Sequence, residues 1–118
     1  LYGLNLSKDK ILETGTAFVV EGQGDVWRLH EAGIENCVGI FGANMSDDQL
    51  VLLEKSGALN LVVLTDYDEA GHRAAEQIKK CGRRFNYHRP NISQKDIGDM
   101  TVEQINNEIL EQLEGVLV

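Results

Sequence analysis

The stretch NLVVLTDYDEAGHRA, from Asn60 to Ala74, decides the fold. Its short apolar run ends in two acids one residue apart, Asp66 and Asp68, and a glycine and a helix-favouring segment follow at once. A short apolar run bounded in this way is typical of a buried strand. Open α/β sheets bind ligands at the carboxyl ends of their strands, so both acids are expected at a ligand-binding edge.

Strand and helix patterns alternate on both sides of this stretch. Residues 1–15 look like a lead-in segment, in which Ser7 could cap a short helix that Gly15 would end. Strands are further expected at 16–20, 37–41 and 84–88, and helices at 25–32, 46–56, 70–81 and 101–114. This alternation predicts a compact, Rossmann-like α/β domain over residues 1–118, with about four mostly parallel strands flanked by helices.

Composition narrows the function classes. The 118 residues carry a net charge of −8, which argues against a nucleic-acid binder acting on its own, because such proteins present basic surfaces. Residues 79–95 nevertheless hold six Lys and Arg residues and no acid. Such a strip is more often a solvated face than a track for phosphates. No apolar run approaches the roughly 20 residues that a membrane span needs, so we expect a cytoplasmic protein without a membrane partner.

Three acids should meet at one edge of the sheet. Glu21 follows the first predicted strand, and Asp66 and Asp68 follow the third. An acid after a strand often caps a helix or starts a turn, and for Glu21 alone that is the simpler interpretation. Three carboxylates on one rim would repel each other, and a hard cation such as Mg²⁺ would relieve the repulsion. The combination therefore favours a metal site.

Other residues refine this interpretation. Gly22, Gly24 and Gly42 follow the strand ends and would let a ligand approach the backbone. They do not form a dinucleotide-binding fingerprint or a P-loop. The two cysteines and three histidines lack the spacing of zinc or iron ligands, and both cysteines are expected to be buried thiols.

Two motifs together resemble the Toprim domain of topoisomerases, primases and some nucleases: VVEGQGD at 19–25 and DYDEAG at 66–71. The similarity is greatest to bacterial-type DNA primases and their phage relatives. It is carried further by LYGL at 1–4, by the stretch that continues VVEGQGD to Asn36, and by GANMSDDQLVLL at 42–53. KDIGDM at 95–100 departs from the commonest bacterial spelling, KDPDE. Because the chain starts with Leu, it is expected to be a piece of a longer primase.

The resemblance implies a nucleotidyltransferase that joins ribonucleotides into short RNA primers on single-stranded DNA during replication. Glu21, Asp66 and Asp68 fall on the catalytic acids that bind Mg²⁺ or Mn²⁺, and Asp96 on a later metal-binding acid, with Asp99 as the alternative. Gly22, Gly42, Asp25 and Arg73 are candidates for substrate or phosphate contacts, and the strip at 79–95 for template or nucleotide contacts.

The full-length protein would bind template and ribonucleoside triphosphates, with a replicative helicase as a further partner. The fragment alone is expected to be inactive. Two alternatives stay open: a Toprim nuclease that cleaves RNA or DNA, and a non-catalytic Toprim module in recombination.

Overall fold

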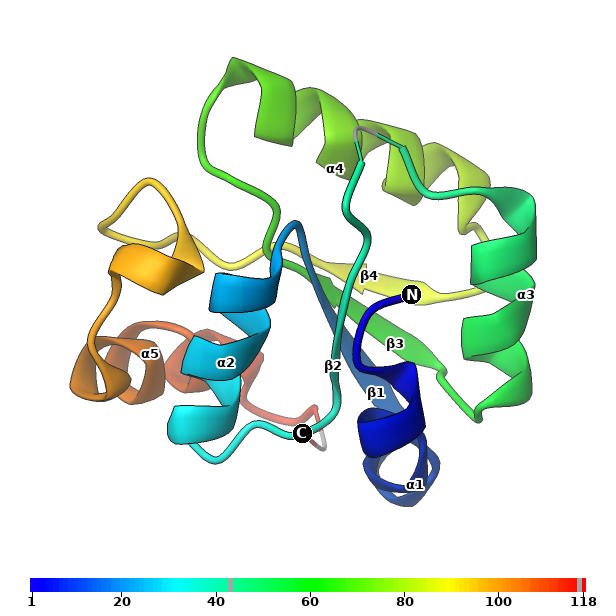
Figure 1. The fold of residues 1–118 in the computed structure, drawn as a ribbon, viewed down its shortest axis with the longest axis horizontal. Coiled ribbons are helices and arrows are strands. Elements are labelled where there is room, and N and C mark those ends of the chain that lie inside the picture. Colours follow the sequence, from blue (N-terminus) through cyan, green and yellow to red (C-terminus); the bar gives the residue numbers. More distant parts are fainter. Residues whose placement is uncertain (43, 117) are drawn as a thin grey trace.

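The computed structural model describes residues 1–42, 44–116 and 118. Helices and strands alternate along most of the chain (Figure 1). In order, the elements are α1 (Leu4–Thr14), β1 (Thr16–Val20), α2 (Gln23–Glu31), β2 (Cys37–Gly39), α3 (Asp47–Lys55), β3 (Asn60–Val63), α4 (Glu69–Cys81), β4 (Asn86–His88), the 3-10 helix η1 (Ile97–Asp99), α5 (Val102–Glu108) and the 3-10 helix η2 (Leu110–Leu113).

The four strands form one parallel sheet in the order β2-β1-β3-β4. The central pair aligns Val19 with Val63, so β1 and β3 end side by side. All four carboxyl ends therefore open on one edge, as the alternation of strand and helix patterns predicted. The predicted α/β architecture is confirmed.

Helices cover both faces of the sheet (Figure 1). Side chains alternate along a strand, so Ala17 and Val19 pack on one face while Phe18 and Val20 pack on the other. The first face is covered by α1, α3 and α4, and the second by α2 and α5. β1 is buried along its whole length, as expected of a central parallel strand. This double burial holds the strand ends, and the acids beyond them, on a rigid frame.

Several predicted boundaries were wrong. α1 starts at Leu4 behind Gly3, whose positive φ of 81° turns the chain into the helix, so Ser7 lies buried inside the helix instead of capping it. The second strand stops at Gly39, because Phe41 takes a positive φ of 49° that a strand does not allow. Cys81 at the end of α4 is exposed, whereas Cys37 is a buried thiol.

The predicted last helix is divided into two pieces. α5 ends at Glu108, and the tighter 3-10 turn η2 continues from Leu110. The side-chain carboxamide of Gln112 accepts from the backbone amide of Asn91 at 2.8 Å and donates to the backbone carbonyl of Asn91 at 2.7 Å. This pair of hydrogen bonds fixes the turn to the segment after β4.

The predicted caps are present elsewhere. The Ser46 hydroxyl accepts from the backbone amide of Gln49 at 3.2 Å, and the Thr101 hydroxyl accepts from the backbone amide of Gln104 at 3.1 Å. Each glutamine side chain bonds back to the capping residue's own amide, which completes a capping box. Gly15, with φ 72°, ends α1 as predicted.

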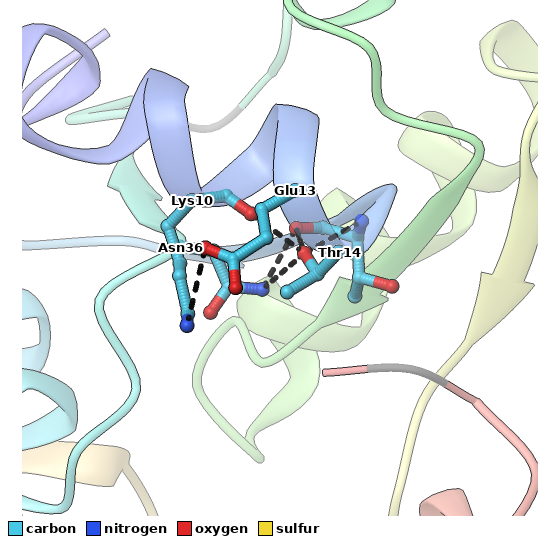
Figure 2. Close-up of polar contacts among 5 residues, drawn as sticks. Lys10, Glu13, Thr14 and Asn36 are labelled. Carbon is cyan, nitrogen blue, oxygen red and sulfur yellow. Dashed lines mark hydrogen bonds and ion pairs between the residues drawn. The ribbon is translucent and has the colours of Figure 1, made fainter.

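A buried polar cluster closes the amino-terminal edge of the sheet (Figure 2). The side-chain amide of Asn36 donates to the Thr14 hydroxyl at 3.3 Å and to the Thr16 carbonyl at 2.8 Å. The Thr14 hydroxyl in turn donates to the Lys10 carbonyl. Asn36 and Thr14 are nearly inaccessible to solvent, so these bonds prevent the cost of burying unpaired polar atoms. At the edge opposite the acids, these bonds hold together the end of α1, the start of β1 and the residue before β2.

No helix within the described residues combines the length and the apolar character that crossing a membrane requires.

Candidate functional site

Glu21 and Asp66 meet at the carboxyl edge of the sheet. Glu21 is the first residue after β1, and Asp66 lies three residues after β3. Since these strands are parallel neighbours, the Asp66 amide reaches the Glu21 carboxylate, donating to Oε2 at 2.6 Å. Glu21 therefore neither caps its own helix nor starts a simple turn. It connects the two central strand ends.

The Asp66 carboxyl is partly buried and lies near other carboxylates. Its pKa is raised to about 7, first by burial and then by the hydrogen bond and the negative charge of Glu21. The charges of Asp25 and Asp96 add to the effect. A carboxyl held in this way keeps its proton near neutrality unless a cation enters the cluster.

Asp25 and Asp96 form the outer part of this cluster. Asp25 accepts from the Gly22 amide at 3.2 Å and from the Gly98 amide at 2.9 Å, so it ties the β1–α2 loop to η1. Burial nevertheless raises its pKa, against the effect of these two amides. Asp96 caps η1 by accepting from the Asp99 amide at 2.9 Å. The structure thus brings Asp96, not the exposed Asp99, among the charges that act on Asp66.

Asp68 is held differently from the other acids. It is the N-cap of α4 and accepts from the Gly71 amide at 2.7 Å. Its second oxygen lies 3.6 Å from the Lys95 ammonium. The Gly71 amide first, and Lys95 next, hold the pKa of this carboxyl below its usual range. Across residues 1–42, 44–116 and 118, no three carboxylate, imidazole or thiol groups are arranged to hold a metal ion in this conformation.

The other predicted contact residues lie around this edge. Gly22 is the extended N-cap residue of α2, and Gly42 is exposed on the loop after β2. Arg73 is exposed one turn along α4, with Nη1 3.0 Å from Glu69 Oε1. A phosphate contact by Arg73 would require this surface ion pair to open.

The basic strip is not one solvated face. Arg84 pairs with Glu54 on α3, and the Lys79 ammonium lies 5.5 Å from the centre of the Tyr87 ring. Arg89 turns inward to the backbone around Asp66, and Lys95 meets Asp68. Sequence reasoning missed these two roles. The available signals were the position of Lys95 directly before Asp96 and that of Arg89 before the only proline.

The raised pKa of Asp66 predicts how stability depends on pH. Between pH 4 and 7 the folded state holds a proton that the unfolded chain releases, so the metal-free domain should lose stability as pH rises through this range. Asp68, with its lowered pKa, contributes in the opposite sense only at lower pH. The loss should be on the order of 1 kcal/mol, after allowing for solvent screening of a partly exposed group.

Urea denaturation in EDTA at pH 5 and pH 8 measures this loss. Asp66→Asn removes the titrating group while keeping its shape, and should flatten the dependence over this range. An equal loss in the wild type and the variant would contradict the assignment to Asp66.

A comparison with protein families assigns most of the chain to a known family. The family model described as the Toprim domain matches residues 15–94, which run from the start of β1 past β4 and include Glu21, Asp66 and Asp68. The chain belongs to the Toprim domain family. The Toprim match thus covers all four strands, the helices between them and the acids that follow β1 and β3.

Curated relatives of this Toprim domain are bacterial DNA primases. The DNA primase of Synechococcus elongatus is 41% identical over 78 residues, which cover 65% of this chain and 11% of that protein. The DNA primase of Deinococcus radiodurans is 31% identical over 120 residues, covering 99% of this chain and 21% of that protein. The Toprim chain thus spans between about a tenth and a fifth of the length of these relatives.

Solved primase structures share the fold. The Aquifex aeolicus primase, solved with its zinc-binding and RNA polymerase domains, superposes with a TM-score of 0.74 at 27% identity, over 98% of this chain and 28% of that one. The RNA polymerase domain of the Mycobacterium tuberculosis primase gives a TM-score of 0.71 at 23% identity, over 98% and 39% of the two chains. The fold of this Toprim domain therefore also occurs within the RNA polymerase domains of primases.

Proposed function

We propose that this domain is the metal-binding part of the nucleotidyl-transfer centre of a DNA primase. The observation that carries the proposal is the bond between the Asp66 amide and the Glu21 carboxylate, which joins the ends of β1 and β3. The curated primase relatives add support. We further propose that this chain is part of a longer primase, the parent protein, which binds the template and the nucleotides and synthesises the primers.

The residues of the edge fit a hard divalent cation. Glu21, Asp66, Asp25 and Asp96 supply only carboxylate oxygens. Burial, followed by the hydrogen bond and charge of Glu21 and the charges of Asp25 and Asp96, raises the pKa of Asp66. Mg²⁺ and Mn²⁺ prefer oxygen ligands. Mg²⁺ is usually held by one or two carboxylates together with substrate phosphates. We assign Glu21, Asp66 and Asp68 as the main ligands, with Asp96 at the margin.

In the proposed reaction a 3′-hydroxyl attacks the α-phosphate of a nucleotide and pyrophosphate leaves. A bound cation would lower the pKa of the hydroxyl and neutralise charge on the phosphates. Residues of this chain hold the acids that would bind the cation. Glu21 fixes the Asp66 backbone, and the Gly71 amide aims one Asp68 oxygen, which leaves the other with Lys95. Lys95 would have to move aside for Asp68 to serve as a ligand.

The surroundings of the edge suggest how substrate could enter. Gly22 and Gly42, which follow β1 and β2, carry no side chain that would block a phosphate, and Arg73 could exchange Glu69 for a phosphate. Asp25 acts through the backbone of Gly22 and Gly98, so its part is to hold the rim in place. The RNA polymerase domain of the Mycobacterium tuberculosis primase was also solved with a double-stranded DNA that carries a six-nucleotide overhang, a structure 28% identical over 82% of this chain. The net charge of −8 suggests that template grip in the parent protein comes from elsewhere.

The test is a primer-synthesis assay with the longer protein. Labelled ribonucleotides and single-stranded DNA are incubated with Mg²⁺, with Mn²⁺ or with EDTA, and end-labelled RNA and DNA are incubated in parallel. We expect short RNA products with either metal and none with EDTA, and no product from the 118-residue chain alone. A replicative helicase partner and a cytoplasmic location would follow from a role in replication.

The same assay discriminates the alternatives. Cleavage of the end-labelled strands without synthesis would favour a Toprim nuclease. Neither synthesis nor cleavage, together with no effect of Mn²⁺ on the NMR signals of Glu21, Asp66 and Asp68, would favour a non-catalytic module.

A further inference from the structure

Arg89 follows β4 and turns back under the loop that carries the two aspartates. Its Nη1 atom donates to the Val63 carbonyl at 3.1 Å, to the Thr65 carbonyl at 3.2 Å and to the Thr65 hydroxyl at 3.1 Å. Its Nη2 atom donates to the Asp66 carbonyl at 3.2 Å. One side chain thus contacts four acceptor atoms, on Val63 at the end of β3 and on Thr65 and Asp66 just beyond it.

These carbonyls lie where the β3–β4 ladder has run out. The last paired residues of β3 and β4 are Val62 and His88, so β4 offers no further backbone donor to the chain after Val62. The Arg89 guanidinium takes over as donor for the carbonyls beyond that point. A fork of fixed N–H groups suits this task, because it can serve several acceptors in one geometry.

The guanidinium is itself fixed from both sides. Its carbon lies 4.0 Å from the centre of the Tyr67 ring, and Nη2 lies 3.0 Å from His72 Nδ1. Arginine is a donor only, so His72 Nδ1 must be the acceptor. Tyr67 is held by two further bonds, from its hydroxyl to the Pro90 carbonyl and from its amide to the Lys95 carbonyl. Tyr67, the residue between the two aspartates, is therefore held through its ring, its hydroxyl and its backbone amide.

We propose that Arg89 is a positioning residue for the proposed metal centre: it fixes the backbone from Val63 to Asp66 and, through Tyr67, the directions in which Asp66 and Asp68 present their carboxylates. The inference rests on the proposed function for its consequence. It rests on the contacts of Arg89 alone for its structural part. Arg89 touches neither carboxylate, so its effect passes through the loop.

The test uses three variants of the 118-residue chain. Arg89→Met removes the fork while keeping an extended side chain, and Arg89→Lys keeps the charge but offers a point donor. Arg83→Met, at an exposed arginine before β4, is the matched control for the loss of one positive charge. Mn²⁺ affinity is measured by water-proton relaxation, and amide hydrogen exchange is followed by NMR without metal.

We expect Arg89→Met to weaken Mn²⁺ binding about 10- to 100-fold, the range found when groups that orient metal ligands are lost. Exchange at the Tyr67 and Gly71 amides should rise at least about tenfold, in proportion to loop opening. Ile105 and Ile109, packed on the face of the sheet that α2 and α5 cover, should stay protected. Arg89→Lys should fall between wild type and Arg89→Met, and Arg83→Met should match wild type.

Three results would overturn the proposal. One is wild-type Mn²⁺ affinity and loop protection in a folded Arg89→Met. Another is an equal loss in Arg83→Met. The third is global unfolding of both Arg89 variants, which would make the residue a general stabiliser. If Arg89→Met alone unfolds, Arg89→Lys decides by the same two readouts. If the wild type binds no Mn²⁺, the proposed metal centre fails, but loop exchange still tests the role of Arg89.

Discussion

Gly71→Ala is expected to break the acid-bearing loop. A Cβ atom at this position would lie 1.7 Å from the Asp66 carbonyl oxygen and 2.5 Å from its carbon. These are backbone atoms, which Arg89 also holds, so the loop or the start of α4 would have to shift. We expect a loss of about 1–3 kcal/mol in the free energy of unfolding, typical of forced overpacking. Primer synthesis by the parent protein should be lost with it.

Gly24→Ala is the matched control. Gly24 lies in the first turn of α2, and a Cβ there would meet nothing within 4 Å. Alanine should leave stability unchanged or raise it by up to roughly 1 kcal/mol, because alanine favours the helix. Urea denaturation of both variants measures the difference. Equal stability of the two, with unchanged NMR signals for Asp66 and Asp68, would show that the loop adapts to a side chain at Gly71.

Asp66→Asn should have the largest effect on activity. Asparagine keeps the size of the side chain and removes the charge that the proposed cation needs. We expect primer synthesis by the parent protein to fall at least about 10²- to 10³-fold, the scale seen when one electrostatic contact to the transition state is removed. The 118-residue chain should keep its fold and lose measurable Mn²⁺ binding.

Asp9→Asn provides the comparison, because Asp9 is an exposed acid on α1 and changes the net charge by the same amount. It should synthesise primers at the wild-type rate. Full activity of Asp66→Asn would remove Asp66 from the metal centre, and an equal loss in Asp9→Asn would trace the effect to overall charge.

The sheet could be predicted from the sequence because its signals are local. TAFVV and NLVVL are short apolar runs, and turn residues separate them from helical patterns. The ends of strands and helices were less accurate. Phe41, shortly after β2, takes a positive φ, and α5 gives way to the turn η2, in which Gln112 binds the Asn91 backbone. Both depend on contacts or conformations that residue type alone does not indicate.

The site divides in the same way. Parallel strands carry whatever follows them to one edge, so the meeting of Glu21 with Asp66 could be expected from position alone. The partner of Asp68 could not, because Lys95 is 27 residues away and comes from a segment with little regular structure. The role of Arg89 could not be predicted either. The charge pattern groups Arg89 with its basic neighbours, but its side chain donates to the Val63 and Asp66 carbonyls, which β4 does not pair.

Asp68 combines an observed structural role with a proposed role as a metal ligand, and a mutational screen would confuse the two. It is a candidate ligand, and its side chain also starts α4 by accepting from the Gly71 amide. An alanine at this position would cost the helix its cap as well as the acid, so a drop in protein abundance could pass for a catalytic defect. Asparagine can still accept at the cap and loses only the charge. The gap in abundance between these two alleles would report the architectural duty of the residue, and the activity that asparagine fails to restore would report the chemical one.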